Sequence, residues 1–201
     1  MKKIIVAITM FVFSSNLMAA NLSPYASAKG ILGFGSSDMY YPTPIGYGAS
    51  GALGLNFKIK DTDMRTEFEF SALWHSKTES EDNKPFDKYN SSYDLRTNLY
   101  MLNLYADLFK KDRLGLYIGT GMGIANFKER FSDNEYFYGT DINIPSEFHR
   151  EKSTFAYGIG VGLYFDITKS LVGDTGLRCT HVVVNNKIII CDAMLGLRYN
   201  F

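Results

Sequence analysis

Residues that would build a metal or cofactor site are scarce in this chain. Only two cysteines and three histidines occur among 201 residues, and the formal net charge is zero. The histidines, His75, His149 and His181, lack the spacing of metal ligands. No basic stripe indicates nucleic-acid binding, and no glycine-rich phosphate-binding motif occurs. We therefore expect no cofactor, no metal ion and no nucleic acid as a partner.

Long apolar runs are missing as well. No window of about 18 apolar residues follows residue 20, which excludes an ordinary membrane-spanning helix there. Strands that cross a membrane escape this test, because polar residues on the other face dilute every window. The chain does contain 15% aromatic residues and 18 glycines against 5 prolines. This composition favours a sheet protein over a helical one.

The first twenty residues have the pattern of a secretory signal peptide. Lys2 and Lys3 precede a short apolar run over residues 4–13, and the small residues Ala19 and Ala20 follow as a cleavage site. We expect a cleaved signal peptide over 1–20 and a single mature domain over 21–201. A membrane-anchoring helix is the alternative, although the apolar run is about half the length that spans a bilayer.

From residue 24 onward, apolar and polar residues alternate along the chain, which is typical of β-strands. Eight segments show this period, and the gaps between them are short and long in turn. Short turns at one end and long loops at the other are typical of an up-and-down barrel in an outer membrane. Only the last gap, near 184–186, is short where a long loop is expected. The predicted strands cover 24–35, 48–60, 64–75, 95–109, 114–126, 154–166, 171–183 and 187–201.

The two faces of these segments favour lipid over water. In 154–166, Phe155, Tyr157 and Ile159 share one face, whereas the other carries mainly glycine. Such a face would be unusual against solvent but suits a narrow lumen. Segment 95–109 has apolar residues on both faces, so the alternation does not orient it. We place Tyr100 and Leu102 toward lipid. The sequence predicts an all-β, eight-stranded antiparallel up-and-down transmembrane β-barrel, and a secreted soluble β protein is the alternative.

If the apolar faces contact lipid, eleven charged side chains point into the lumen. Five are basic and six acidic, so they nearly balance, as a water-poor interior requires. We interpret them as a structural ion-pair network rather than as catalytic acids and bases. Eight strands enclose only enough space for side chains, so we expect a plugged barrel, with a narrow porin-like channel as the alternative. The eleven residues are Lys29, Lys58, Arg65, Glu67, Glu69, Asp107, Asp166, Asp174, Arg178, Asp192 and Arg198.

The two cysteines lie on the last two predicted strands. A three-residue turn at 184–186 pairs residues whose numbers add to 370, which places Cys179 opposite Cys191 on the lipid-facing side. An exported protein meets an oxidising compartment, so a cross-strand disulfide is possible. Two free thiols facing lipid are the alternative, and a two-residue turn would shift the register and separate the pair.

Catalysis has little support in the sequence. His75 adjoins Ser76, and His181 adjoins Thr180, but neighbours on a strand point to opposite faces and cannot act together. We expect no enzyme, with a lipid-modifying acyltransferase or deacylase as the alternative. Specific binding should instead lie in the loops near 36–47, 76–94 and 127–153. Their aromatic binding candidates are Tyr40, Tyr41, Tyr136, Phe137 and Tyr138.

Several stretches together resemble the small outer-membrane β-barrel superfamily that contains opacity-type surface antigens and OmpA-like membrane domains. They are "PYASAKGILGFG", "RTEFEF", "MLNLYAD", "LYIGTGMGIA" and the closing "GLRYNF". The fifth-strand motif departs from the family where Leu116 replaces a common proline. The resemblance implies a Gram-negative outer membrane, contact with its lipid and lipopolysaccharide, and Phe201 as the signal for the barrel-assembly machinery.

The same resemblance implies a function in adhesion or host interaction, by analogy only. We therefore expect an outer-membrane surface protein that is structural and adhesive, and whose extracellular loops contact host-cell surface molecules.

Overall fold

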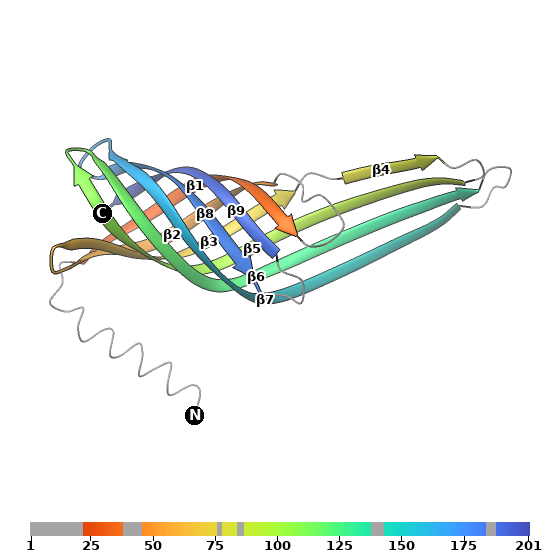
Figure 1. Cartoon of the computed structure of the whole chain (residues 1–201), viewed down its shortest axis with the longest axis horizontal. Helices are drawn as coiled ribbons and strands as arrows, with labels where there is room; N and C mark the ends of the chain where they lie inside the picture. Colours follow the sequence, from red (N-terminus) through yellow and green to blue (C-terminus); the bar gives the residue numbers. More distant parts are fainter. Residues whose placement is uncertain (1–21, 38–45, 76–77, 84–86, 138–142, 184–187) are drawn as a thin grey trace, which may run out of the picture.

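The strands of this protein form a closed barrel that continues as a flat sheet at one end (Figure 1). The structure, a computed structural model, describes residues 22–37, 46–75, 78–83, 87–137, 143–183 and 188–201. In this part of the chain, no helix is long and apolar enough to cross a membrane. The strands are β1 (Ser23–Ser37), β2 (Gly46–Ile59), β3 (Thr62–His75), β4 (Thr78–Asn83), β5 (Asp87–Lys111), β6 (Leu114–Phe137), β7 (Asn143–Asp166), β8 (Leu171–Val182) and β9 (Ile188–Asn200).

Eight of these strands close the ring, which confirms the predicted barrel. The hydrogen-bonded order is β3-β2-β1-β9-β8-β7-β6-β5, and β5 pairs back onto β3. Every pairing is antiparallel. The remaining strand, β4, pairs only with β5 and lies outside the ring. Because the ring is closed, every barrel strand has a neighbour on both sides.

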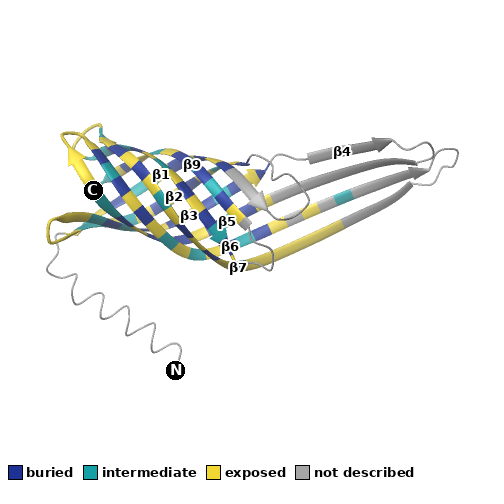
Figure 2. Cartoon of the chain, in the orientation of Figure 1, coloured by how far each residue is buried: buried dark blue, intermediate teal, exposed yellow. Residues whose placement is uncertain are grey.

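Burial alternates residue by residue along the barrel strands, as Figure 2 shows. Many large apolar side chains are exposed, and many of the polar and charged side chains are buried. The ambiguous segment 95–109 follows the predicted orientation, because Tyr100 and Leu102 are exposed and Tyr105 is buried. This inverted pattern is that of a barrel whose outer surface contacts lipid.

The predicted short turns exist, but two of them are tighter than expected. Only Lys60 and Asp61 separate β2 from β3, and only Asp112 and Arg113 separate β5 from β6. In each turn the first residue has a positive φ, 54° at Lys60 and 53° at Asp112. Two-residue hairpins require this conformation because it matches the twist of the flanking strands.

Two of the predicted long loops are strands, and this is the main correction to the expected architecture. Most of the segments 76–94 and 127–153 is taken up by β4 and by the extended parts of β5, β6 and β7. β5 stays paired with β6 as far as Asp87 opposite Phe137, and β6 stays paired with β7 as far as Tyr136 opposite Asn143. Outside the membrane no face has to be apolar, so the hydrophobic alternation disappears although the pairing continues.

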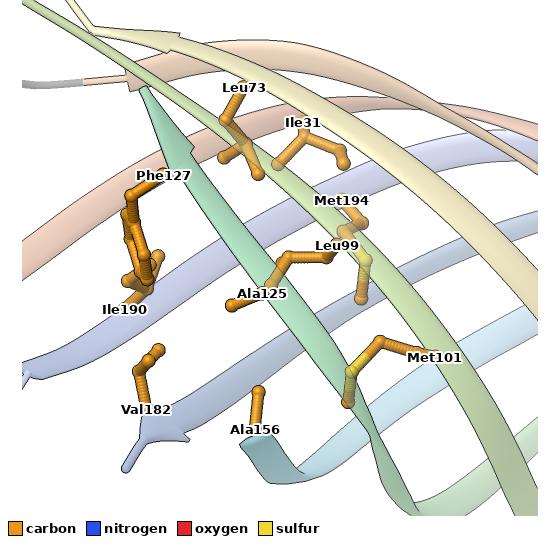
Figure 3. Close-up of a cluster of buried hydrophobic side chains, with 10 residues drawn as sticks. All are labelled: Ile31, Leu73, Leu99, Met101, Ala125, Phe127, Ala156, Val182, Ile190 and Met194. Atoms are coloured by element: carbon orange, nitrogen blue, oxygen red, sulfur yellow. The ribbon is translucent and has the colours of Figure 1, made fainter. Parts of the chain in front are cut away.

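The lumen is filled in layers, and the layer toward the projecting sheet is apolar (Figure 3). The predicted polar lumen therefore describes only part of the interior. Leu99 and Met101 on β5 belong to this layer, which explains why segment 95–109 is apolar at both parities. The buried cluster comprises Ile31, Leu73, Leu99, Met101, Ala125, Phe127, Ala156, Val182, Ile190 and Met194.

Below the apolar layer, glycine makes room for aromatic rings. A Cβ atom added to Gly119 on β6 would overlap the ring of Tyr105 on β5. In contrast, a Cβ added to Gly51, on the outer face of β2, would meet only the Ser27 carbonyl oxygen at 3.9 Å. The lumen-facing glycine is therefore a packing requirement, and the lipid-facing one is not.

Gly119→Ala should consequently destabilise the barrel, whereas Gly51→Ala should not. We expect Gly119→Ala to lower the free energy of unfolding by about 1–3 kcal/mol, the usual effect of overpacking a filled interior. Gly51→Ala should change it by less than about 0.5 kcal/mol. Urea unfolding of both variants in lipid vesicles would measure the difference. Equal stability of the two variants would contradict the proposed packing.

Candidate functional site

The centre of the lumen holds a chain of ion pairs that joins opposite walls of the barrel. Arg178 on β8 contacts Glu69 on β3 at 2.6 Å and Asp192 on β9 at 3.1 Å. Lys29 on β1 lies 3.1 Å from Glu69 and 3.0 Å from Glu67. All five side chains are almost completely buried. Buried charges are tolerated when each has such a partner.

A second cluster surrounds Arg65, one layer nearer the short turns. Its guanidinium lies 3.5 Å from Asp174 and 3.8 Å from Asp107. The same group lies over the rings of Tyr105 and Tyr117, at 4.4 and 4.1 Å from their centroids. Tyr117 also donates a hydrogen bond to Asp174 at 2.7 Å. Tyrosines thus supply both the cation–π contacts and the donors that the carboxylates need.

Glu67 connects the two clusters. Its carboxylate accepts hydrogen bonds from Tyr25 at 2.9 Å and from Tyr105 at 2.7 Å, besides its contact with Lys29. The gap left between the central side chains, beside Arg178, is only about 10 Å³, roughly the space that one water molecule needs.

Two of the eleven predicted lumen residues lie outside the buried network. Lys58 is 58% exposed and pairs with Asp63 at 3.7 Å, and the half-exposed Lys110 pairs with Asp166 at 2.9 Å. The two predicted residues, Lys58 and Asp166, are on the inward-facing side of their strands, but they lie at the rim, where β2 and β7 extend past the filled part of the barrel. Arg198 is buried, yet it makes no ion pair with any described residue.

The outer edge of the lipid-facing surface is sharp on β5, β6 and β7. One cross-strand row is apolar or aromatic, the next is polar, and charged residues follow. In the polar row Asn126 donates a hydrogen bond to Ser153 at 3.1 Å. From Leu114 to Ile124 the apolar face of β6 has the length of a transmembrane strand. The successive rows are Tyr100–Ile124–Phe155, Asn98–Asn126–Ser153 and Arg96–Lys128–Glu151.

The charged residues beyond this edge form a basic collar on the outward face. The collar consists of Arg96, Lys128, Arg130 and His149, and two acidic residues, Asp94 and Glu151, lie in the same rows. Lys128 pairs with Glu151 at 3.5 Å, and the Arg130 Nε donates to His149 Nδ1 at 3.5 Å. Cations just beyond the polar row that borders an apolar band lie at the height of lipid headgroups.

Aromatic side chains frame the lipid-facing band at both ends. Near the outer edge the rings of Tyr47 and Trp74 lie 6.2 Å apart. At the end with the short turns, Tyr199 and Phe201 lie 5.5 Å apart, and both are exposed. Aromatic girdles at the two interfaces are typical of transmembrane barrels. The backbone N–H of Phe201 donates to Pro24, which ties the end of the chain to β1.

Cys179 and Cys191 lie directly opposite each other on β8 and β9, in the predicted register. The structure joins them by a disulfide. Both side chains are on the outward face, and residues 184–187 of the connection lie outside the described part.

Of the two histidines that adjoin hydroxyl residues, His181 does not form a catalytic pair with its neighbour Thr180. Thr180 is fully buried in the lumen, whereas the ring of His181 packs outside, 5.1 Å from that of Tyr157. Ser76 lies outside the described residues, so the pair with His75 is not described. Among the described residues, no group of histidine, cysteine and acidic side chains could hold a metal ion.

The aromatic binding candidates lie at the far end of the molecule or outside the description. Tyr136 and Phe137 end β6, at the tip of the projecting sheet, whereas Tyr40, Tyr41 and Tyr138 lie outside the described residues. Another aromatic residue of the segment 127–153, Phe148, is exposed on β7. The collar was missed, because Lys128, Arg130 and His149 lie in the segment 127–153, which was predicted to be a loop.

A closed eight-stranded ring, an apolar outer band and aromatic girdles define a small transmembrane β-barrel. Comparison with known proteins agrees, because the profile of the outer membrane protein beta-barrel domain family matches residues 4–189. The chain belongs to this family. It is therefore an outer-membrane protein of a Gram-negative bacterium, as predicted.

Individual relatives share less with the chain. Outer membrane protein PagN of Salmonella typhimurium is 29% identical over 89 residues, which are 44% of this chain and 36% of that protein. The match thus spans about a third of the length of this curated relative.

Two solved structures show the same fold over 90% of this chain and 99% of theirs, at 15% identity. Neisserial surface protein A has a TM-score of 0.59. Ail, the attachment invasion locus protein of Yersinia pestis, has a TM-score of 0.53 in its complex with the heparin analogue sucrose octasulfate.

The central ion pairs predict a strong loss of stability when one partner is removed. Arg178→Met leaves Asp192 buried without a cation and should lower the free energy of unfolding by about 3–5 kcal/mol. Adding Asp192→Asn removes the uncompensated charge, so the double variant should recover at least about 1 kcal/mol. Lys58→Met, at the exposed pair, should cost less than about 1 kcal/mol.

Urea unfolding in vesicles, followed by tryptophan fluorescence, would measure all three variants. If Arg178→Met were no more destabilising than Lys58→Met, the interpretation of the lumen as a stabilising ion-pair network would be wrong.

Proposed function

We propose that this protein is a non-enzymatic surface protein that binds molecules of a host cell through the sheet projecting from its barrel. The observation that carries the proposal is the continuation of β5, β6 and β7 beyond the lipid-facing band. Residues 126–137 of β6 alone extend roughly 40 Å along the strand. A rigid paired sheet holds its tip far from the membrane surface, where another cell can be reached.

The charge of the projection changes along its length. Residues 131–147 contain four acidic and no basic residues, and 78–94 contain five acidic and two basic ones. The collar near the membrane is basic. The acidic tip, with its aromatic residues, suits a partner with a basic surface, because complementary charge speeds association. Tyr136 and Phe137 end β6 within this tip and are the proposed contact residues.

The projecting sheet also has a free edge. Residues 143–153 of β7 pair with β6 on one side only. On the other side the contact with β8 ends at Val183, whose backbone N–H donates to the Phe155 carbonyl. Among the described residues no strand lies alongside this edge, which forms the lower border of the projection in Figure 1. Unpaired backbone groups of this kind can accept an extended segment of a partner.

The basic collar supports a second contact, with lipopolysaccharide in the same membrane. Its cations lie one row beyond the polar edge of the lipid-facing band, where the phosphate groups of the outer leaflet are expected. Arginine and lysine are the usual partners of phosphate. This contact would anchor the base of the sheet while the tip remains available.

Four further points concern export and the alternative functions. Residues 1–20 are proposed to be a cleaved signal peptide, and Phe201 to be the signal for the barrel-assembly machinery. The separation of Thr180 from His181 argues against a lipid-modifying enzyme. The apolar layer and the central ion pairs fill the lumen, which argues against a porin-like channel.

Shortening the sheet tests the adhesive function directly. Phe131 and Phe148 face each other on β6 and β7, so residues 132–147 can be replaced by an Asn-Gly turn. Cells that display this variant should lose most of their binding to host cells, because the tip is gone. A second variant keeps the length but changes the four acidic residues of 131–147 to amides, and it should bind weakly if charge attracts the partner.

The heat-modifiable mobility of both variants in detergent gels would show that the barrel still folds. Wild-type binding by cells that carry the shortened protein would contradict the proposed function.

The collar predicts that lipopolysaccharide stabilises the barrel. We expect added lipopolysaccharide to raise the thermal unfolding midpoint of the wild-type protein in vesicles. The increase should be at least halved in the variant Lys128→Gln, Arg130→Gln, because two phosphate contacts are lost. Lys111→Gln, Arg113→Gln removes the same charge at the opposite end of the barrel and should respond as the wild type does. An equal response of both double variants would rule out the collar as the binding site.

A further inference from the structure

A cavity opens at the end of the barrel with the short turns, opposite the projecting sheet. Its volume is about 510 Å³, and it lies between the ends of β2, β3, β5, β7, β8 and β9. In an outer-membrane barrel this end faces the periplasm. Five basic side chains line the cavity against three acidic ones, so it carries an excess of positive charge. The basic residues are Lys58, Lys60, Arg65, Lys110 and Arg198.

The carboxylates that line the cavity already have partners. Asp63 pairs with Lys58, and Asp166 pairs with Lys110. Asp107 accepts a hydrogen bond from Tyr164 at 2.6 Å and contacts the Arg65 guanidinium. These contacts leave no carboxylate of the cavity for the remaining arginine.

Arg198 is that remaining arginine. It is only 7% exposed, and its Nε has no hydrogen-bond partner. Its guanidinium carbon lies 5.4 Å from the ring of Tyr25 and 5.5 Å from that of Tyr164, and none of the described carboxylates is within ion-pair distance. A buried guanidinium held by aromatic rings, with its Nε–H unpaired, is costly unless an acceptor enters from the cavity.

We propose that this cavity binds a small soluble anion that carries a phosphate group, and that Arg198 is its main ligand. A guanidinium presents parallel donors that match two phosphate oxygens. Lys60 makes no ion pair with a described residue, and it can add a second positive charge. The barrel wall encloses the site, which favours a soluble anion over the headgroup of a membrane lipid. The proposal is independent of the adhesive function at the other end.

The test follows the Nε–H resonance of Arg198 by NMR, with the mature wild-type chain folded in a phosphate-free maltoside detergent. Inorganic phosphate should shift this resonance in a saturable manner at low ionic strength. Dihexanoyl-phosphatidylglycerol is titrated in a parallel arm to probe a lipid headgroup. We expect a weaker shift with the lipid at the same concentration. A saturable shift with the lipid alone, or with neither probe, would overturn the proposal.

Variants separate this site from general surface charge. Calorimetry should show that Arg198→Gln weakens phosphate binding at least about fivefold, because a charged hydrogen-bonding partner is lost. Arg113→Gln removes an exposed charge from the β5–β6 turn, outside the cavity, and should leave the affinity within about twofold. If Arg198→Gln does not fold, Arg198→Lys keeps the charge but loses the paired donors and should still weaken binding. Equal losses of phosphate affinity in the Arg198 variants and in Arg113→Gln would refute the site.

Discussion

Hydrocarbon offers no hydrogen bonds, so every backbone donor and acceptor that crosses the membrane must find its partner within the chain. The pairing of β1 with β9 satisfies this requirement by closing the ring and leaving no edge among the barrel strands. Outside the membrane the requirement no longer applies. There β7 can leave β8 and present an open edge to water. The same constraint therefore explains both the closed barrel and the place where it opens into a sheet.

Closing eight strands creates an interior that side chains must fill. The chain fills it in three layers, with an apolar layer toward the cell surface, ion pairs in the centre, and aromatic rings around Arg65 below. Glycines such as Gly119 leave room for these rings next to the wall. The lumen is then occupied by stabilising contacts, which leaves binding to the two ends, where the surface is open and the charge is unbalanced.

The barrel and most of its charged interior could be predicted from the sequence, because one face of each strand must match lipid and therefore alternates. The same signal gave the register that places Cys179 opposite Cys191. The alternation does not predict strands outside the membrane, where no face has to match lipid. The extensions of β5 to β7 lack the alternation and were predicted as loops, and Lys58 keeps the inward parity at a rim that no longer encloses it. The apolar layer around Leu99 was hidden because its residues resemble a lipid face.

The central claim is that paired strands, rather than loops, carry the outer surface of this protein. Amide hydrogen exchange of the folded protein in lipid tests it most directly, because exchange reports backbone hydrogen bonds. Residues 128–136 of β6 have neighbours on both sides and should exchange slowly, whereas part of the free edge of β7 before Ala156 should exchange fast. Rapid exchange throughout residues 128–136, at the rate of unpaired chain, would contradict the projecting sheet.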